Sequence, residues 1–132
     1  MRPRLAPWVV GAAISAAPAA FAACPPAMAD GAPLQAGPVR LAWRAEPMTF
    51  RTGQPFVLQL QLCPAQAVLA RVDATMPEHR HGMNYQPSLH DLGDGRWRVD
   101  GLLWHMAGRW ALRFDVRHDG GTHTLRQDVV LR

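Results

Sequence analysis

Residues 109–117 read Arg-Trp-Ala-Leu-Arg-Phe-Asp-Val-Arg, and this stretch decides the fold. Its large apolar side chains, Trp110, Leu112, Phe114 and Val116, are separated by single smaller or charged residues. Because successive side chains of a β-strand point to opposite faces, this period of two predicts a strand with one buried face and one polar face. A helix would require apolar residues three and four positions apart, and the stretch does not have them.

The same alternation recurs along the chain. It is found in four further stretches, 39–43, 56–62, 97–99 and 125–131. Turn-forming residues separate the stretches at Gly53-Gln54-Pro55, Gly93-Asp94-Gly95 and Asp119-Gly120-Gly121. About seven short antiparallel strands separated by such turns predict an all-β fold, a β-sandwich of two packed sheets. The candidate core aromatics are Trp43, Trp97 and Trp110.

The composition fits one globular domain and excludes several classes of protein. The chain has 132 residues, of which 48% are hydrophobic and 18% charged, and this balance is not that of a disordered protein. All 14 basic residues are arginines, which excludes chemistry that depends on a lysine amine. Only the N-terminal stretch is apolar for long enough to approach a bilayer span, which excludes a polytopic membrane protein.

The first residues are typical of an export signal. Arg2 and Arg4 precede an Ala-rich apolar run, and Ala20-Phe21-Ala22 matches a signal-peptidase site. We therefore expect residues 1–22 to be a signal peptide and the mature protein to be periplasmic. Loss of the two signal arginines lowers the formal charge from +4 to +2, which is too weak to indicate nucleic-acid binding.

The mature chain is expected to have two parts. Residues 23–38 are rich in Pro, Ala and Gly and are interpreted as a tether, and residues 39–132 form the folded domain. Cys24 and Cys63 leave two outcomes open. Two cysteines in an exported chain predict one disulfide, whereas the sequence Phe21-Ala-Ala-Cys24 loosely resembles a lipobox, in which Cys24 is lipidated and anchors a lipoprotein. The two outcomes exclude each other and differ in mass.

One segment gathers side chains that bind soft metals. Residues 76–83 read Met-Pro-Glu-His-Arg-His-Gly-Met, and His105-Met106 forms a second group. Thioether sulfur together with imidazole nitrogen favours copper, especially Cu(I). If residues 79–83 are extended, His79, His81 and Met83 point to the same side. The alternative is structural: Met76 and Met106 fill gaps in the core, and the two histidines lie on a surface loop.

The chain lacks a recognisable catalytic set. Ser88 has no G-x-S-x-G context, and the acid/base pair Glu78-His79 has no nucleophile beside it. The other carboxylates are scattered along polar strand faces, where they are expected to pair with arginines. We therefore expect a protein that is not an enzyme.

Three motifs in order resemble a known family. They are Met76-Pro-x-His-x-His-Gly-Met83, Gly93-x-Gly-x-Trp-x-Val-x-Gly-Leu102 and His105-Met-x-Gly-x-Trp110. Together they resemble the YtkA-like group, to which FixH-like proteins are related, over residues 39–132. The resemblance implies an immunoglobulin-like sandwich, exported or membrane-tethered, with links to copper handling and to the assembly of copper-containing oxidases. It assigns the ligand motif to His79, His81, Met83 and Met106, with Met76 next; related sequences often carry an aromatic residue where this chain has His105.

The leading hypothesis is an exported copper-binding module that transfers or buffers the metal. Its candidate ligands are His79, His81, Met83, Met106, Met76 and His105. The expected partner is a copper-receiving or envelope protein, with membrane contact only through lipidation or an uncleaved signal. Two alternatives stay open: a metal-free interaction module in which residues 76–83 form a structural corner, and a lipoprotein subunit of an envelope complex.

Overall fold

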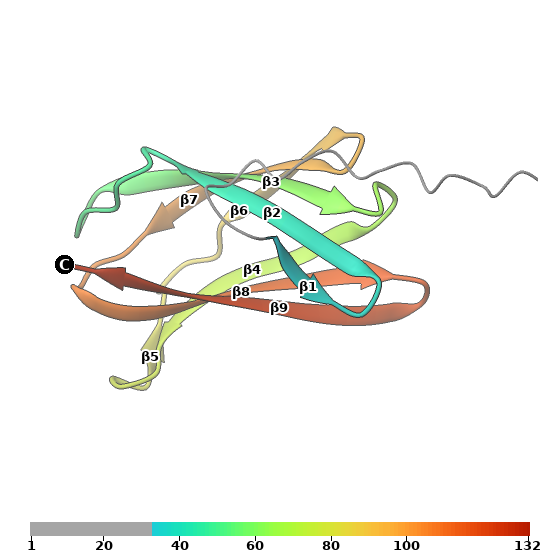
Figure 1. The fold of residues 1–132 in the computed structure, drawn as a ribbon. Coiled ribbons are helices and arrows are strands. Elements are labelled where there is room, and N and C mark those ends of the chain that lie inside the picture. Colours follow the sequence, from blue (N-terminus) through green and yellow to red (C-terminus); the bar gives the residue numbers. More distant parts are fainter. Residues whose placement is uncertain (1–32) are drawn as a thin grey trace, which may run out of the picture.

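The computed structural model describes residues 33–132, and all regular structure in this part of the chain is β-strand. The strands are β1 (Leu34–Ala36), β2 (Val39–Glu46), β3 (Pro55–Cys63), β4 (Val68–Met76), β5 (His81–Gly82), β6 (Ser88–Gly93), β7 (Arg96–Leu103), β8 (Gly108–His118) and β9 (Gly121–Leu131). One sheet has the order β1-β2-β3-β7-β6 and the other β5-β4-β8-β9, with every pair antiparallel. Figure 1 shows the two sheets as separate layers, which confirms the predicted β-sandwich.

The described residues contain more strands than the pattern of alternation indicated. β4 escapes that pattern because a register shift between Leu69 and Arg71 interrupts its alternation. β6 escapes it because this edge strand exposes nearly all of its side chains. β1 lies within the stretch that the composition assigned to the tether, so strand pairing begins before Val39. The predicted signal peptide and Cys24 lie outside the described residues, and residues 33–132 include no helix able to span a membrane.

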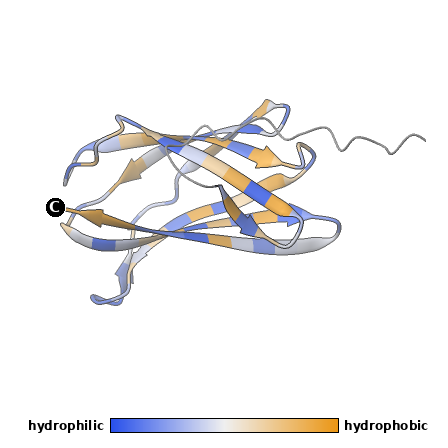
Figure 2. Cartoon of the chain, in the orientation of Figure 1, coloured by the Kyte–Doolittle hydropathy of each residue, from blue (hydrophilic) through white to orange (hydrophobic). Residues whose placement is uncertain are grey.

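The core forms where the inner faces of the two sheets meet. On β8, Trp110, Leu112, Phe114 and Val116 are completely buried, as their alternation predicted. Figure 2 shows how apolar and polar residues alternate along the strands. The aromatic centre of the core is the stacked pair of Trp104 and Trp110, whose rings lie 5.7 Å apart and nearly parallel. Burying these large aromatic side chains contributes to the hydrophobic stabilisation of the fold.

The other predicted core tryptophans are placed less centrally. Trp97 is buried, and Trp43 is half-buried with its ring 6.5 Å from that of Phe114. Trp104 was not among the predicted core aromatics, because it follows β7 and therefore lies outside any alternating stretch. Its position between the rings of Phe50 and Phe56 buries it to within 1% of complete.

A buried carboxylate on β8 gives the fold an acid-sensitive element. Asp115 accepts hydrogen bonds from Arg113 Nε at 2.9 Å and from Thr124 Oγ1 at 2.7 Å. Burial alone would raise the pKa of Asp115, but these hydrogen bonds and the charge of Arg113 outweigh it and hold the pKa below its ordinary value. A carboxyl group with a depressed pKa stabilises the fold above its unfolded pKa and loses that contribution as the pH falls through its folded pKa.

We therefore expect Asp115→Asn to lower the free energy of unfolding at pH 7 by about 1–3 kcal/mol. Because the unfolded pKa of an aspartate is about 3.9, part of the wild-type loss of stability below about pH 4 should be absent from the variant. Urea unfolding at pH 7 and pH 3 measures both effects. Glu46→Gln is the control, since its ion pair with Arg44 is exposed and should contribute less than about 1 kcal/mol. Equal losses in the two variants would contradict the assignment.

Candidate metal centre

Three connecting segments meet at one end of the sandwich, which we call the loop end. They are the β2–β3 loop (47–54), the β4–β5 turn (77–80) and the β7–β8 loop (104–107). Gly53 N–H donates to the Trp104 carbonyl at 2.8 Å, which joins the first loop to the third. The ring of His81, directly after the turn, lies 5.2 Å from that of His105, which joins the second to the third. Figure 1 shows the loop end on the side of the C-terminus.

The β4–β5 turn reverses the chain immediately before the candidate ligands. His79 N–H donates to the Met76 carbonyl at 3.1 Å, and Arg80 has a left-handed backbone with φ of 54°. Such a turn suits Pro77, whose ring fixes φ near the value that an early turn position requires. The extended conformation considered for residues 79–83 is therefore wrong at His79, because regular pairing begins only at His81.

An ion-pair network fixes the turn to the neighbouring strands. Arg109 of β8 donates to Glu78 at 2.7 Å and to Asp128 of β9 at 2.9 Å. The hydrogen bond from Arg109 lowers the pKa of the Glu78 carboxyl, which stays ionised. Both carboxylates are thus engaged by a guanidinium group. The network orients the turn, and it leaves imidazoles as the polar candidates for metal binding at the loop end.

Three imidazole rings form a row, and two of them, His81 and His105, contact the indole ring of Trp110. His81 is in the middle, with its ring 5.7 Å from His79 and 5.2 Å from His105. The indole of Trp110 forms the floor, at 6.1 Å from the His81 ring and 5.5 Å from the His105 ring. Two imidazoles that share one ion, each with a metal–nitrogen bond of about 2.0 Å, have ring centres roughly 5 Å apart. The spacing of the rings therefore fits neighbouring ligands of one metal ion.

His81 carries the least satisfied polar atom of the row. It pairs with Met76 across β4 and β5, so its side chain lies on the same inner side as this core residue. Its Nδ1 atom is buried and has no hydrogen-bond partner among the described residues. A buried polar atom without a hydrogen-bond partner lowers the free energy of unfolding by about 1–3 kcal/mol. A functional role would explain why the protein keeps such an atom.

The three imidazole rings lie close together, but they are not arranged around a common metal position. Within residues 33–132 no three His, Cys, Asp or Glu side chains are arranged to hold a metal ion together. His79 and His105 are exposed, and exposed side chains change rotamer within nanoseconds. Joint ligation with His81 therefore requires the two outer rings to turn towards the central one, while the backbone can stay in place.

The methionines take three different positions. Met76 is only 1% exposed, and its methyl group fills the space above Gly108, where an added Cβ would lie 2.7 Å from it. This placement favours the core interpretation for Met76. Met106 is half-buried in the β7–β8 loop beside His105, and its carbonyl accepts a hydrogen bond from Trp110 Nε1 at 3.0 Å. Met83 directly follows β5, is half-buried and packs against the core, and its N–H donates to the Ala74 carbonyl.

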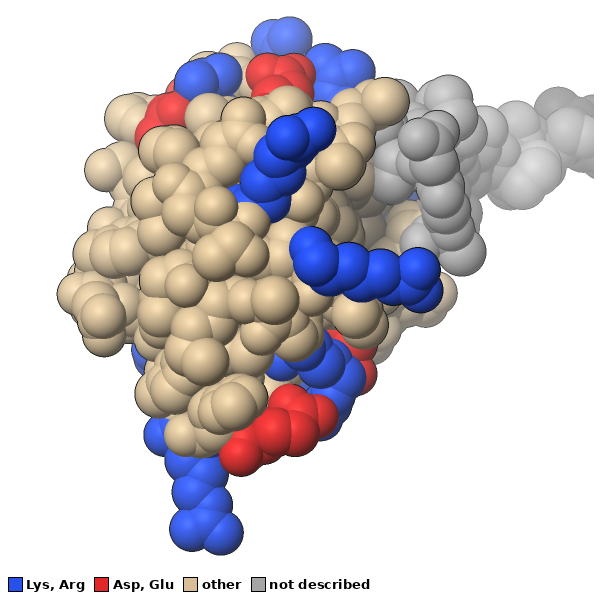
Figure 3. Space-filling model, turned by 90° about the vertical axis from the view of Figure 1, so that its left-hand side faces the viewer, with Lys and Arg blue, Asp and Glu red and all other residues tan. Residues whose placement is uncertain are grey.

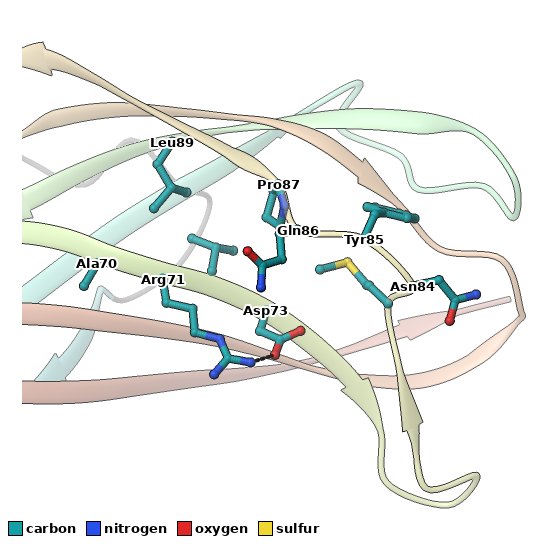
Figure 4. Close-up of a pocket in the computed structure, with 10 residues that line it drawn as sticks. Ala70, Arg71, Asp73, Asn84, Tyr85, Gln86, Pro87 and Leu89 are labelled. Atoms are coloured by element: carbon teal, nitrogen blue, oxygen red, sulfur yellow. Dashed lines mark hydrogen bonds and ion pairs between the residues drawn. The ribbon is translucent and has the colours of Figure 1, made fainter.

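Met83 also lines a separate groove of about 600 Å³ between β4 and the segment that crosses to β6. Figure 4 shows Arg71 and Asp73 of β4 on one wall, joined by an ion pair, with Gln86 and Pro87 across from them. Tyr85 donates to the Leu103 carbonyl, and burial raises the pKa of its hydroxyl. The sequence did not predict this groove, since it forms only where the chain reverses between β4 and the segment that leads to β6.

The remaining histidines and Cys63 lie elsewhere. His118 and His123 face each other across the β8–β9 turn, with ring centres 6.5 Å apart, and His90 lies 3.4 Å from Asp100. Cys63 is buried at the end of β3. Its predicted partner Cys24 lies outside the described residues, so the disulfide stays a prediction.

Comparison with known proteins gives no information about this site. No protein-family model matches the chain, no curated protein matches it, and no solved structure matches it. The resemblance to the YtkA-like group therefore stays a prediction. What the molecule itself presents is a β-sandwich whose loop end brings three imidazole rings together, two of them against the buried Trp110, with Met106 next to His105 in the chain.

Proposed function

We propose that this protein is an exported copper-binding module that holds Cu(I) at the loop end. His81 would be the central ligand, with His79 and His105 on either side of it. Met106 would supply a thioether from the same loop as His105. The observation that carries the proposal is the buried Nδ1 of His81, which has no partner among the described residues although it lies between two other imidazoles.

The donor set is the reason for choosing copper. Imidazole and thioether together suit Cu(I), whereas Ca²⁺ and Mg²⁺ require oxygen ligands. The nearest carboxylates, Glu78 and Asp128, are bound to Arg109 and so do not supply those oxygens. When bound, the metal would be cargo to be stored and passed on, and the chain would position it and shield one side of it.

The surroundings support reversible binding. Trp110 closes the inner side of the row and excludes water there, whereas His79 and His105 are open to solvent. An ion could therefore enter and leave from one side only. That arrangement suits transfer or buffering by a periplasmic protein, which is the role the resemblance to the YtkA-like group also implies.

A titration of the mature chain with Cu(I), against a coloured competing chelator and without oxygen, tests the proposal. We expect one equivalent to bind, with quenching of tryptophan fluorescence because Trp110 borders the site. His79→Ala/His81→Ala should weaken binding at least about 100-fold, since even residues that only support a ligand contribute 10–100-fold. His118→Ala/His123→Ala is the matched control, because it removes a neighbouring histidine pair far from the loop end and should leave the affinity unchanged.

Two results would reject copper binding at the loop end. One is the absence of Cu(I) uptake by the wild-type chain. The other is an unchanged affinity in His79→Ala/His81→Ala. If that variant instead lowers only the unfolding midpoint, residues 76–83 are a structural corner, and the metal-free interaction module becomes the better description.

A further inference from the structure

The loop end carries an exposed apolar side chain in the β2–β3 loop. Met48 in the β2–β3 loop is 78% exposed, the largest exposed fraction of any large apolar side chain among the residues described. The same loop packs on Trp104 through Phe50, whose ring lies 4.6 Å from the indole, and Trp104 directly precedes His105. A large apolar residue held in water next to a candidate site is typical of a contact surface.

The charges around the loop end are mainly positive. Arg51 and Arg80 are exposed, and neither has an ion-pair partner in the described part of the chain. Arg109 bridges Glu78 and Asp128 and offsets one of their two negative charges, so these three arginines and two carboxylates together carry a net charge of +1. Figure 3 looks onto this end of the molecule and shows a largely uncharged surface with arginines projecting from it and carboxylates only towards its margins.

We propose that the loop end is the docking surface for an acidic protein that carries copper, an inference that rests on the proposed function. The metal can pass directly between two proteins only if their sites come within a few ångströms. A partner must therefore cover the histidine row, which brings it to the end of the sandwich that also carries Met48, Arg51 and Arg80. Two uncompensated guanidinium groups attract carboxylates and repel a basic surface, which selects an acidic rim on the partner.

The transfer is a ligand exchange and involves no electron transfer. A Cu(I)–sulfur bond to the donor breaks as a Cu(I)–nitrogen bond to an imidazole of this chain forms, and the ion stays Cu(I) throughout. The imidazoles bind in their neutral form, and the donor thioether leaves uncharged. No oxidant, reductant or proton donor is needed.

The test uses a synthetic peptide with four aspartates and two methionines, loaded with Cu(I), as the acidic donor. Stopped-flow quenching of tryptophan fluorescence reports the rate at which the full mature chain receives the ion. We expect Arg51→Glu/Arg80→Glu to slow transfer about tenfold at low ionic strength, because electrostatic steering changes association rates by 10-fold or more. The effect should shrink in 0.5 M salt, where the Debye length is only about 4 Å.

The matched control is Arg40→Glu/Arg117→Glu, which changes the net charge equally on exposed strand positions away from the loop end. It should alter the transfer rate less than about twofold, since both arginines lie towards the other end of the strands and the Coulomb energy falls with distance. A peptide in which lysines replace the aspartates should transfer Cu(I) to the wild-type protein more slowly than the acidic peptide does. The same lysine peptide should transfer Cu(I) to Arg51→Glu/Arg80→Glu faster than to the wild-type protein.

Equilibrium affinity for Cu(I) separates this inference from the proposed function. If the wild-type chain binds no Cu(I), both are overturned. If Arg51→Glu/Arg80→Glu keeps its Cu(I) affinity but receives the ion as fast as wild type, only the docking surface is overturned. Arginine-dependent binding to anionic lipid vesicles, without any effect on transfer from the acidic peptide, would also overturn it and would assign the arginines to a membrane.

Discussion

Replacing His81 by leucine should remove high-affinity Cu(I) binding and at the same time make the metal-free protein more stable. Leucine fills a similar volume against Met76 and Trp110 and has no polar atom to leave unsatisfied. Loss of the buried, unpartnered Nδ1 should raise the free energy of unfolding by about 1 kcal/mol. Loss of the central ligand should weaken Cu(I) binding at least about 100-fold.

The opposite signs make this substitution informative. Most core substitutions destabilise a protein, whereas a residue kept for binding can be improved for stability at the expense of function. Unfolding in urea without metal measures the first effect, and competition titration with Cu(I) measures the second. His105→Leu is the control, because this exposed histidine has no buried orphan atom and its loss should weaken binding without stabilising the fold. A His81→Leu protein that is less stable and still binds Cu(I) normally would show that His81 is structural.

The sequence predicted those strands whose alternation is uninterrupted. On β8 the period of two covers four completely buried residues, and on β3 it covers Phe56, Leu58, Leu60 and Leu62. These strands are recognisable because each lies inside a sheet and buries one face along its whole length. β4 pairs over a similar length, but the irregularity after Leu69 moves the following side chains out of phase.

The sequence predicted which types of ligand the candidate site contains, but not how these ligands are arranged in space. The ligand types of residues 76–83 and of His105-Met106 are visible in the sequence, and so is the turn at Pro77. That His81 adjoins His105 depends on the order β5-β4-β8 in one sheet and on the β7–β8 loop arriving from the other. Local patterning carries no information on either, because both follow from how the two sheets pair and pack.

Trp110 has one role that the sequence pattern predicted and a second role that it did not predict. Its alternation with Leu112 placed it in the core, where it stacks on Trp104. Its outer rim also forms the floor beneath His81 and His105, a role that no pattern indicated. The rigid aromatic centre can therefore hold an unsatisfied imidazole in place, since the large apolar area buried around it outweighs the cost of one orphan nitrogen.

The opposite end of the sandwich depends on a close backbone contact, which gives a second large effect. Gly95 lies in the β6–β7 turn with φ of 74°, and its carbonyl accepts a hydrogen bond from Leu62 N–H at 2.7 Å. The buried Gln61 side chain holds the same turn by donating to the Asp94 carbonyl at 2.9 Å. A Cβ at Gly95 would lie 2.5 Å from the Leu62 carbonyl oxygen and 3.0 Å from the Ala65 Cα.

Gly95→Ala should therefore lower the free energy of unfolding by about 3 kcal/mol or more, because strain in the left-handed region adds to a clash between backbone atoms. Gly93→Ala is a matched control in the same turn: its φ of 81° imposes the same conformational strain, yet an added Cβ there meets nothing within 4 Å. The control should lose only about 1 kcal/mol, the usual cost of a left-handed alanine. Urea unfolding of the two variants gives the difference. Equal losses would mean that β3 moves aside, and that the contact with Leu62 does not fix the turn. A larger loss at Gly95 would show that the turn and the end of β3 form one rigid unit, held at the other end of the molecule from the histidine row.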